Sequence, residues 1–209
     1  FSQYTFPMPN FDELQANIRL YHRLGVHGVF MQGMGEEGGG AESMALRGYV
    51  ISRLLWDPDQ DVWALVDRFL QHYYGAAAAN VRRYLDIFHK RVREDNALHP
   101  SCYDPPTHPL FAGDILPRAD HALAQGEALV RGRQRLRVQL LRAGLAYARL
   151  QQTCGKFSLQ DDIYRGSASE TDRQAFESLV TLWKRAKICR LREGTPLAYT
   201  ADQIRNRLA

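Results

Sequence analysis

The feature that most constrains the fold is a pair of short apolar stretches near the N-terminus, separated by one helical pattern. Gln3–Phe6 precedes two prolines, and Val26–Gln32 is rich in β-branched and aromatic residues and is bounded by glycine. Both stretches are predicted strands, and the second has the composition of a strand buried on both faces. Between them, apolar residues recur at helical spacing over residues 11–24.

A strand, helix, strand unit does not make a stable sheet by itself, because parallel strands need neighbours and covered faces. The intervening helix has a length that suits a right-handed crossover between parallel strands. We therefore expect residues 1–56 to be the last two βα units of a (β/α)8-type barrel, with its other strands in a preceding part of a longer chain. Such barrels place active-site residues at the C-terminal ends of their strands.

Every later periodic segment has helical spacing, and no second group of strands is predicted. Helices are predicted over residues 43–56, 61–74, 77–93, 117–130, 133–151 and 169–192, with a short one from Thr200. Caps and stops are predicted at Asn10 with Glu13, at Asp61, at Ser169 with Asp172, and at Gly75. Residues 57–209 should thus form an α-helical extension with a proline-rich loop at 96–117. The expected fold class is α-rich α/β.

Composition and motifs argue against several classes of protein. The three cysteines are far apart and odd in number, which is not typical of a disulfide framework or a CxxC metal pair. No stretch reaches the roughly 18 apolar residues of a membrane-spanning helix, and no nucleotide-binding glycine motif is present. We therefore predict no cofactor, no metal and no membrane partner.

The net charge of +4 is unevenly distributed along the chain. Residues 128–160 contain no acid but seven basic residues: Arg131, Arg133, Arg135, Arg137, Arg142, Arg149 and Lys156. One interpretation is a binding surface, which would make the chain a non-enzymatic helical interaction module. The other is a solvated helix face whose acids lie on a neighbouring element. No aromatic residues are interleaved with the arginines as single-stranded nucleic acid would favour, so no nucleic-acid partner is predicted.

Two segments of the sequence are similar to a known family. NFDELQANIRLYHRLGVHGVFMQG, followed by ALRGYVISRLLWDPDQDVWALVDRFLQHYYGAAAANVRRYLDIFH, resembles an uncharacterised bacterial family of glycoside-hydrolase-like proteins. In that family the barrel is related to those of alpha-glucuronidases and beta-hexosaminidases. The likeness is strongest over residues 10–90, and its most distinctive part is LLWDPDQDV leading into FLQHYYG.

The resemblance implies a carbohydrate-active protein, often exported, whose substrate binds to the complete barrel. It implies that the rest of the barrel, the N-terminal remainder of the same chain, is the structural partner of this segment. Members of the family often have a carboxylate on the strand that matches Val26–Gln32, where this sequence has Met31. The reaction is not identified by the resemblance.

Four residues near the predicted strand ends are candidate substrate contacts: Tyr4, Gln32, Glu36 and Glu37. Glycoside hydrolysis uses two carboxyl groups about 5 to 5.5 Å apart for retention, or about 6.5 to 9.5 Å for inversion. Glu36 and Glu37 are adjacent in a glycine-rich loop, so their directions are unspecified and they are not assigned as that pair. Tyr4 is expected either to stack on a sugar or to pack at the rim. The main acid and base are expected from strands outside this chain.

Other polar and aromatic residues have simpler explanations. Glu42 precedes a predicted helix, where the helix dipole stabilises an acid. A set of aromatic residues is expected to be buried because it follows helical periodicity: Trp56, Trp63, Phe69, Tyr73 and Tyr74. His72 and His89 lie on predicted helices without a carboxylate or cysteine at metal-binding spacing. His99 and His108 lie in the proline-rich loop with Asp104 between them, where a metal is a minor alternative.

Overall fold

The chain is helical over most of its length, which confirms the predicted α-rich class. The computed structural model describes residues 5–31, 38–101, 104–154, 157–160, 163–166, 168–192 and 194–208. Within these residues the helices are α1 (Phe11–Arg23), α2 (Met44–Trp56), α3 (Val62–Tyr74), α4 (Ala78–Glu94), α5 (Ile115–Ala128), α6 (Gly132–Cys154), α7 (Glu170–Arg185) and α8 (Leu197–Leu208). Short 3-10 helices span Gly75–Ala77 and Pro109–Phe111.

Two small antiparallel hairpins follow the main helices, so the prediction of no further strands was wrong. Strand β1 (Phe157–Gln160) pairs with β2 (Ile163–Gly166), and β3 (Arg190–Arg192) pairs with β4 (Thr195–Pro196). Helix α7 ends earlier than predicted because Lys187 has a φ of 58°, a left-handed conformation that ends a helix. These strands are only two to four residues long, which is why period-2 alternation did not reveal them.

The predicted buried strand at Val26–Gln32 is not present in the described residues. Residues 26–31 pair with no strand, and residues 26–30 are all exposed, Phe30 by 89%. The prediction was wrong for this chain because a buried strand needs neighbouring strands on both sides, and none of the described elements supplies them. Of Gln3–Phe6, only Thr5 and Phe6 are described; they lie in a turn, and both are buried.

Three of the four predicted helix caps and stops are present in the structure, and one is not. Asp61 caps α3 by accepting a hydrogen bond from the amide of Ala64, and Gly75 follows α3. Ser169 and Asp172 form a capping box at α7. Asn10 precedes α1 as predicted, but its side chain caps nothing, because it accepts a hydrogen bond from Arg47 of α2 instead.

The core lies between the central helices, where α4 packs on α5 and α5 packs on α6. Its largest fully buried side chains include Trp183, Tyr84, Phe11, Phe88 and Phe176. The described part of the proline-rich loop contributes Phe111, which packs against Phe88 and against Phe6. The loop therefore closes one side of the core, and the helices before and after it are in contact.

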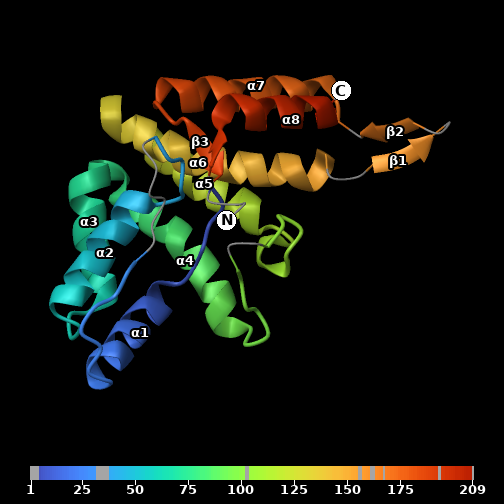
Figure 1. The fold of residues 1–209 in the computed structure, drawn as a ribbon. Helices are drawn as coiled ribbons and strands as arrows, with labels where there is room; N and C mark the ends of the chain where they lie inside the picture. Colours follow the sequence, from blue (N-terminus) through green and yellow to red (C-terminus); the bar gives the residue numbers. More distant parts are fainter. Residues whose placement is uncertain are drawn as a thin grey trace.

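The C-terminal elements lie together on one side of the molecule (Figure 1). Helices α7 and α8 lie side by side over α6, and the hairpin β1–β2 projects from the same region. Helices α2 and α3 form a pair on another side, with α1 beside them. The glycine-rich segment that precedes α2 reaches the C-terminal elements, where it contacts the residues that follow α7.

This glycine-rich segment is held against residues 187–191 by backbone contacts. Gly39 forms a parallel β-bridge with Arg190. The amide of Gly40 donates a hydrogen bond to the carbonyl of Arg190, and the amide of Cys189 donates one to the carbonyl of Gly38. A Cβ at Gly38 would lie 2.9 Å from the Cys189 sulfur, and one at Gly40 would lie 2.9 Å from a methyl group of Ile188. Gly38 also has a φ of 73°. The glycines are therefore required for close packing.

We predict that Gly38→Ala will destabilise the protein more than Gly113→Ala. Both glycines have positive φ, 73° and 71°, so each substitution should incur about 1 kcal/mol of backbone strain. Nothing lies within 4 Å of a Cβ at Gly113, whereas at Gly38 the new methyl group meets the Cys189 side chain and the Lys187 carbonyl. We expect a total cost of at least about 2 kcal/mol for Gly38→Ala, measured by urea unfolding. Equal losses of unfolding free energy in the two variants would contradict the close approach of Gly38 to Lys187 and Cys189.

Candidate functional site

All four predicted substrate contacts, Tyr4, Gln32, Glu36 and Glu37, lie outside the described residues. Their roles stay predictions. The described chain resumes at Gly38 and leads directly into two cavities of interest. We name them the loop cavity, beside residues 39–46, and the helix cavity, between α5, α6 and α7.

The loop cavity has a volume of about 220 Å³ and lies where the glycine-rich segment meets three helices. Its walls include residues 39–46, Tyr73 and Tyr74 from the end of α3, Arg137 from α6, and Trp183 from α7. The segment that sequence analysis placed at a strand end thus does border a cavity. Arg137 and Trp183, on other walls of this cavity, come about 90 to 145 positions later in the chain.

Glu42 is a buried centre of hydrogen bonds and not only an acid at a helix end. It is 8% exposed and lies just before α2, as predicted. Its carboxylate accepts hydrogen bonds from the Tyr84 hydroxyl at 3.0 Å and from Ser43, and it forms an ion pair with Arg47 at 3.1 Å. Burial, together with the Glu42 charge, raises the pKa of Tyr84 well above its ordinary value, so the phenol stays protonated and donates.

His89 also links helices and shows no catalytic arrangement. It is buried, its Nε2 atom accepts from the amide of Phe11 at 3.3 Å, and its Nδ1 atom lies 2.8 Å from the Leu85 carbonyl. Burial lowers the pKa of His89 to about 4, so the ring is neutral near pH 7. The ring stacks on Phe11 and meets Trp63 edge-on.

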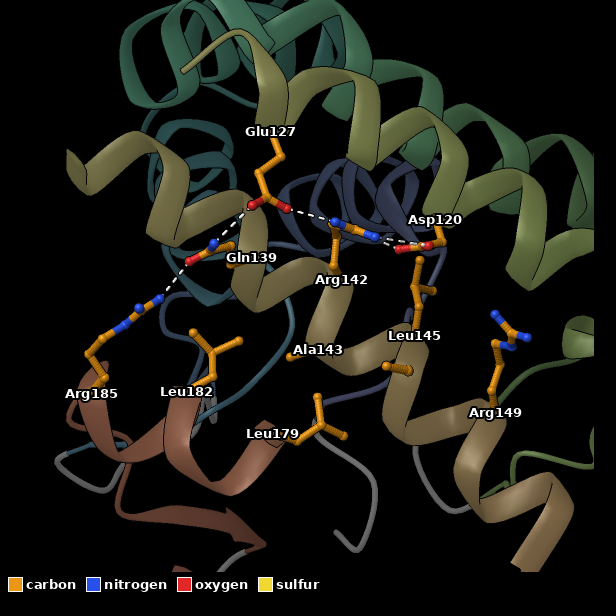
Figure 2. Close-up of a pocket in the computed structure, with 11 residues that line it drawn as sticks. Asp120, Glu127, Gln139, Arg142, Ala143, Leu145, Arg149, Leu179, Leu182 and Arg185 are labelled. Carbon is orange, nitrogen blue, oxygen red and sulfur yellow. Dashed lines mark hydrogen bonds and ion pairs between the residues drawn. The ribbon is translucent and has the colours of Figure 1, made fainter. Parts of the chain in front are cut away.

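The helix cavity has a volume of about 410 Å³ and contains a continuous polar network (Figure 2). Arg142 of α6 binds Asp120 at 2.7 Å and Glu127 at 2.7 Å, both on α5. Glu127 also accepts from Gln139, and Gln139 accepts from Arg185 of α7. The network connects three helices across one face of the cavity, as the dashed lines in Figure 2 show.

The charges of this network favour a structural role over acid catalysis. Glu127 is 9% exposed, and burial alone would raise its pKa. Hydrogen bonds from Arg142, Gln139 and Arg135 outweigh the burial and lower the pKa of Glu127 below its ordinary value. The hydrogen bonds that Arg142 donates to Asp120 and Glu127 raise the pKa of Arg142. Glu127 is therefore held as an anion, whereas a glycosidase acid must be protonated.

Three of the seven basic residues in the segment 128–160 make contacts within the fold. Arg135 and Arg142 pair with acids on α5, which is the neighbouring-element interpretation. Arg137 donates to the Tyr73 carbonyl at 2.6 Å and lies over the Tyr73 ring. The sequence analysis did not identify Asp120 and Glu127 as the acids that pair with Arg135 and Arg142. Their spacing of seven residues, which places two side chains on one helix face, just before an acid-free helix, was the available signal.

Of the five aromatic residues predicted to be buried, one is buried, three are half-buried and one is exposed. Tyr74 is buried, while Trp63, Phe69 and Tyr73 are half-buried against the core. Trp56, the last residue of α2, is 87% exposed. The prediction was wrong there because Trp56 lies two residues after the buried Leu54, and two residues are about half a helical turn apart, so its side chain is on the opposite side of the helix. Trp56 and Phe30 are the two most exposed of the large apolar side chains in the described residues.

Two negative findings apply to the part of the chain that the structure describes. No three His, Cys, Asp or Glu side chains gather there in a way that could hold a metal ion. Among the helices described, none has both the length and the apolar character needed to cross a membrane.

Comparison with known proteins gives one family match. The model of a domain of unknown function, DUF4838, matches residues 1–86. This range covers the two predicted strands, α1 to α3 and the first half of α4. No curated protein and no solved structure matches the chain.

We predict that Glu127→Gln will destabilise the protein by about 1 to 2 kcal/mol at pH 7, because Arg142 and Arg135 lose an anionic partner at a largely buried position. The folded-state pKa of Glu127 is lowered, so its stabilisation is complete above its ordinary pKa of 4.5 and is lost as the pH falls through the folded pKa. The difference in unfolding free energy between the wild type and Glu127→Gln should therefore become smaller below about pH 4.5.

The matched control is Glu94→Gln, which removes an exposed ion pair to Lys90. This change should cost no more than about 0.5 kcal/mol. Unfolding free energies from urea titrations at several pH values provide the comparison. A Glu127→Gln cost equal to that of Glu94→Gln would argue against the network as a connection between helices.

Proposed function

We propose that this chain is the C-terminal portion of a glycoside-hydrolase-like, carbohydrate-active protein. In this proposal residues 1–56 complete the last two βα units of a (β/α)8-type barrel, and the later helices extend from it. The match of residues 1–86 to a domain of unknown function is compatible with one conserved unit in this region, but it names no reaction. The sugar chemistry rests on the family resemblance described above.

The observation that supports the proposal most directly is the exposed apolar run after α1. Leu24 is 70% exposed and Phe30 89%, with Val26 and Val29 also exposed. Each large apolar side chain of this kind gains about 1.5 to 3 kcal/mol when it is fully buried. A β-branched and aromatic run with no pairing partner is what the edge of an incomplete sheet would present.

The position of the glycine-rich segment agrees with a role in substrate contact. In a (β/α)8 barrel the loop after a strand faces the active site, and here that loop contains Glu36 and Glu37 and ends at Gly38–Gly40, which are held by residues 187–191. We propose that Tyr4, Gln32, Glu36 and Glu37 contribute substrate contacts. The main acid and base would come from earlier strands.

The alternative, a helical interaction module with an arginine-rich surface, has less support. Arg135, Arg137 and Arg142 all make contacts within the fold. Their charges and donors are therefore at least partly used before any partner binds. These internal contacts favour the carbohydrate-active proposal over the interaction module.

Phe30→Asp tests the proposed sheet. In the isolated chain the side chain is exposed, so the unfolding free energy should change by no more than about 0.5 kcal/mol. In the longer parent protein, neighbouring strands would bury residue 30, and the same change should cost at least about 2 kcal/mol. Tyr199→Asp on α8, where Tyr199 is 57% exposed, serves as the control and should be neutral in both. A small change in unfolding free energy on Phe30→Asp in both proteins would contradict the proposed sheet.

Activity assays test the proposed chemistry. We expect the parent to hydrolyse uronic-acid or hexosaminide substrates and this chain alone to show no turnover, because the acid and base lie elsewhere. The double change Glu36→Gln with Glu37→Gln in the parent should raise KM while kcat is largely kept, since it removes binding contacts. Robust turnover by the chain alone, or unchanged KM in the double variant, would contradict the proposal.

A further inference from the structure

We propose that the loop cavity binds a small carboxylate ligand, held by Arg137, by the hydroxyl of Tyr74 and by the N-terminus of α2. This inference does not rest on the proposed function. It concerns side chains that are described and brought together within this chain.

The N-terminus of α2 lacks the usual side-chain cap. Ser43 precedes the helix with a φ of 50°, and its hydroxyl donates to Glu42 and accepts no hydrogen bond from the helix. No acid lies in the first turn of this thirteen-residue helix. Met44, Ala45 and Leu46 line the cavity. First-turn amides without a side-chain cap and the positive end of the helix dipole favour an anion at this position, in addition to the Glu42 carboxylate that precedes the helix.

Tyr74 is a buried donor without a partner, and it lines the same cavity. It is 4% exposed, and no residue in the described ranges forms a hydrogen bond with its hydroxyl. Burial and the nearby Glu42 raise the pKa of Tyr74, so the phenol remains protonated and can donate. The Tyr74 hydroxyl is therefore available to donate a hydrogen bond to a ligand oxygen in the cavity.

Arg137 provides the positive charge. Its Nη1 atom donates to the Tyr73 carbonyl at 2.6 Å, which fixes the side chain against the cavity wall. It forms no ion pair with any acid in the described residues. The acid on the described wall, Glu42, is already paired with Arg47 and hydrogen-bonded to Tyr84. The guanidinium therefore retains donors and charge for a carboxylate.

The cavity also limits the ligand's size and type. Its volume of about 220 Å³ is below the usual range for drug-sized ligands, so it fits a small molecule. The ring of Tyr73 has Arg137 over it and stacks on Phe69, while Trp183 packs edge-on against Tyr147. These rings are occupied within the protein, and none is left as a platform for a neutral sugar. Recognition must therefore depend on the anionic group.

The test is isothermal titration calorimetry of this chain at low ionic strength with four probes: succinate, D-glucuronate, D-glucose and inorganic phosphate. We expect saturable binding of at least one carboxylate and none of glucose. Binding of succinate identifies a free organic acid as the source of the carboxylate, and binding of glucuronate alone identifies an acidic sugar. Arg137→Gln should weaken the binding at least tenfold, and Tyr74→Phe at least threefold.

The matched control is Arg133→Gln, which removes the same charge from an exposed position of α6 that does not line the cavity. Its affinity should equal that of the wild type. If Arg137→Gln does not fold, Tyr74→Phe keeps the ring packing and still tests the hydroxyl. The proposal is overturned if neither carboxylate binds, if phosphate binds alone, or if the Arg133→Gln and Arg137→Gln variants lose affinity equally. Inactivity of the parent on sugars would leave these outcomes unaffected.

Discussion

The close backbone contact between Gly38–Gly40 and residues 187–191 is the constraint on which the rest of the structure depends. It joins a segment near the N-terminus to the turn after α7, with no side chain between the two backbones. Once this contact is made, the start of α2 and the buried Glu42 are placed against the ends of α3 and α7. The loop cavity exists because these parts meet. A side chain at Gly38 or Gly40 would separate them, since packed backbones cannot accommodate an added Cβ at 2.9 Å.

Several ion pairs in the described residues connect different helices. Arg142 joins α6 to α5, Arg93 of α4 binds Asp12 of α1, and Arg205 of α8 binds Glu177 of α7. Single exposed pairs of this type contribute little, but Arg142 and Glu127 form part of a network with partly buried members. Two arginines of the stretch that suggests a binding surface in the sequence, Arg135 and Arg142, are thus partners in internal ion pairs. Arg137 differs, because its partner is a carbonyl.

Local signals in the sequence predicted local structure well. The caps at Asp61 and Ser169 and the stop at Gly75 are made by atoms within a few residues of one another, so their patterns are sufficient. Asn10 has the same pattern, but Arg47, thirty-seven residues later, takes its side chain. The segment after α1 had the composition of a buried strand, yet composition cannot show whether neighbouring strands are present. The four candidate contacts, Tyr4, Gln32, Glu36 and Glu37, lie outside the described residues, so their roles stay predictions. The loop cavity and the helix cavity were not predicted from the sequence.

The sequence by itself determined the α-rich class, the positions of most helices and the concentration of basic residues at 128–160, because helical periodicity and charge can be read along the chain. Only the tertiary structure decided which acids those arginines meet, that Glu42 is buried against Tyr84, and that Tyr74 and Arg137 share a cavity with the start of α2. The physical reason is distance along the chain: these contacts join residues from 8 to about 90 positions apart. Such contacts depend on how whole helices pack, and no local pattern encodes them.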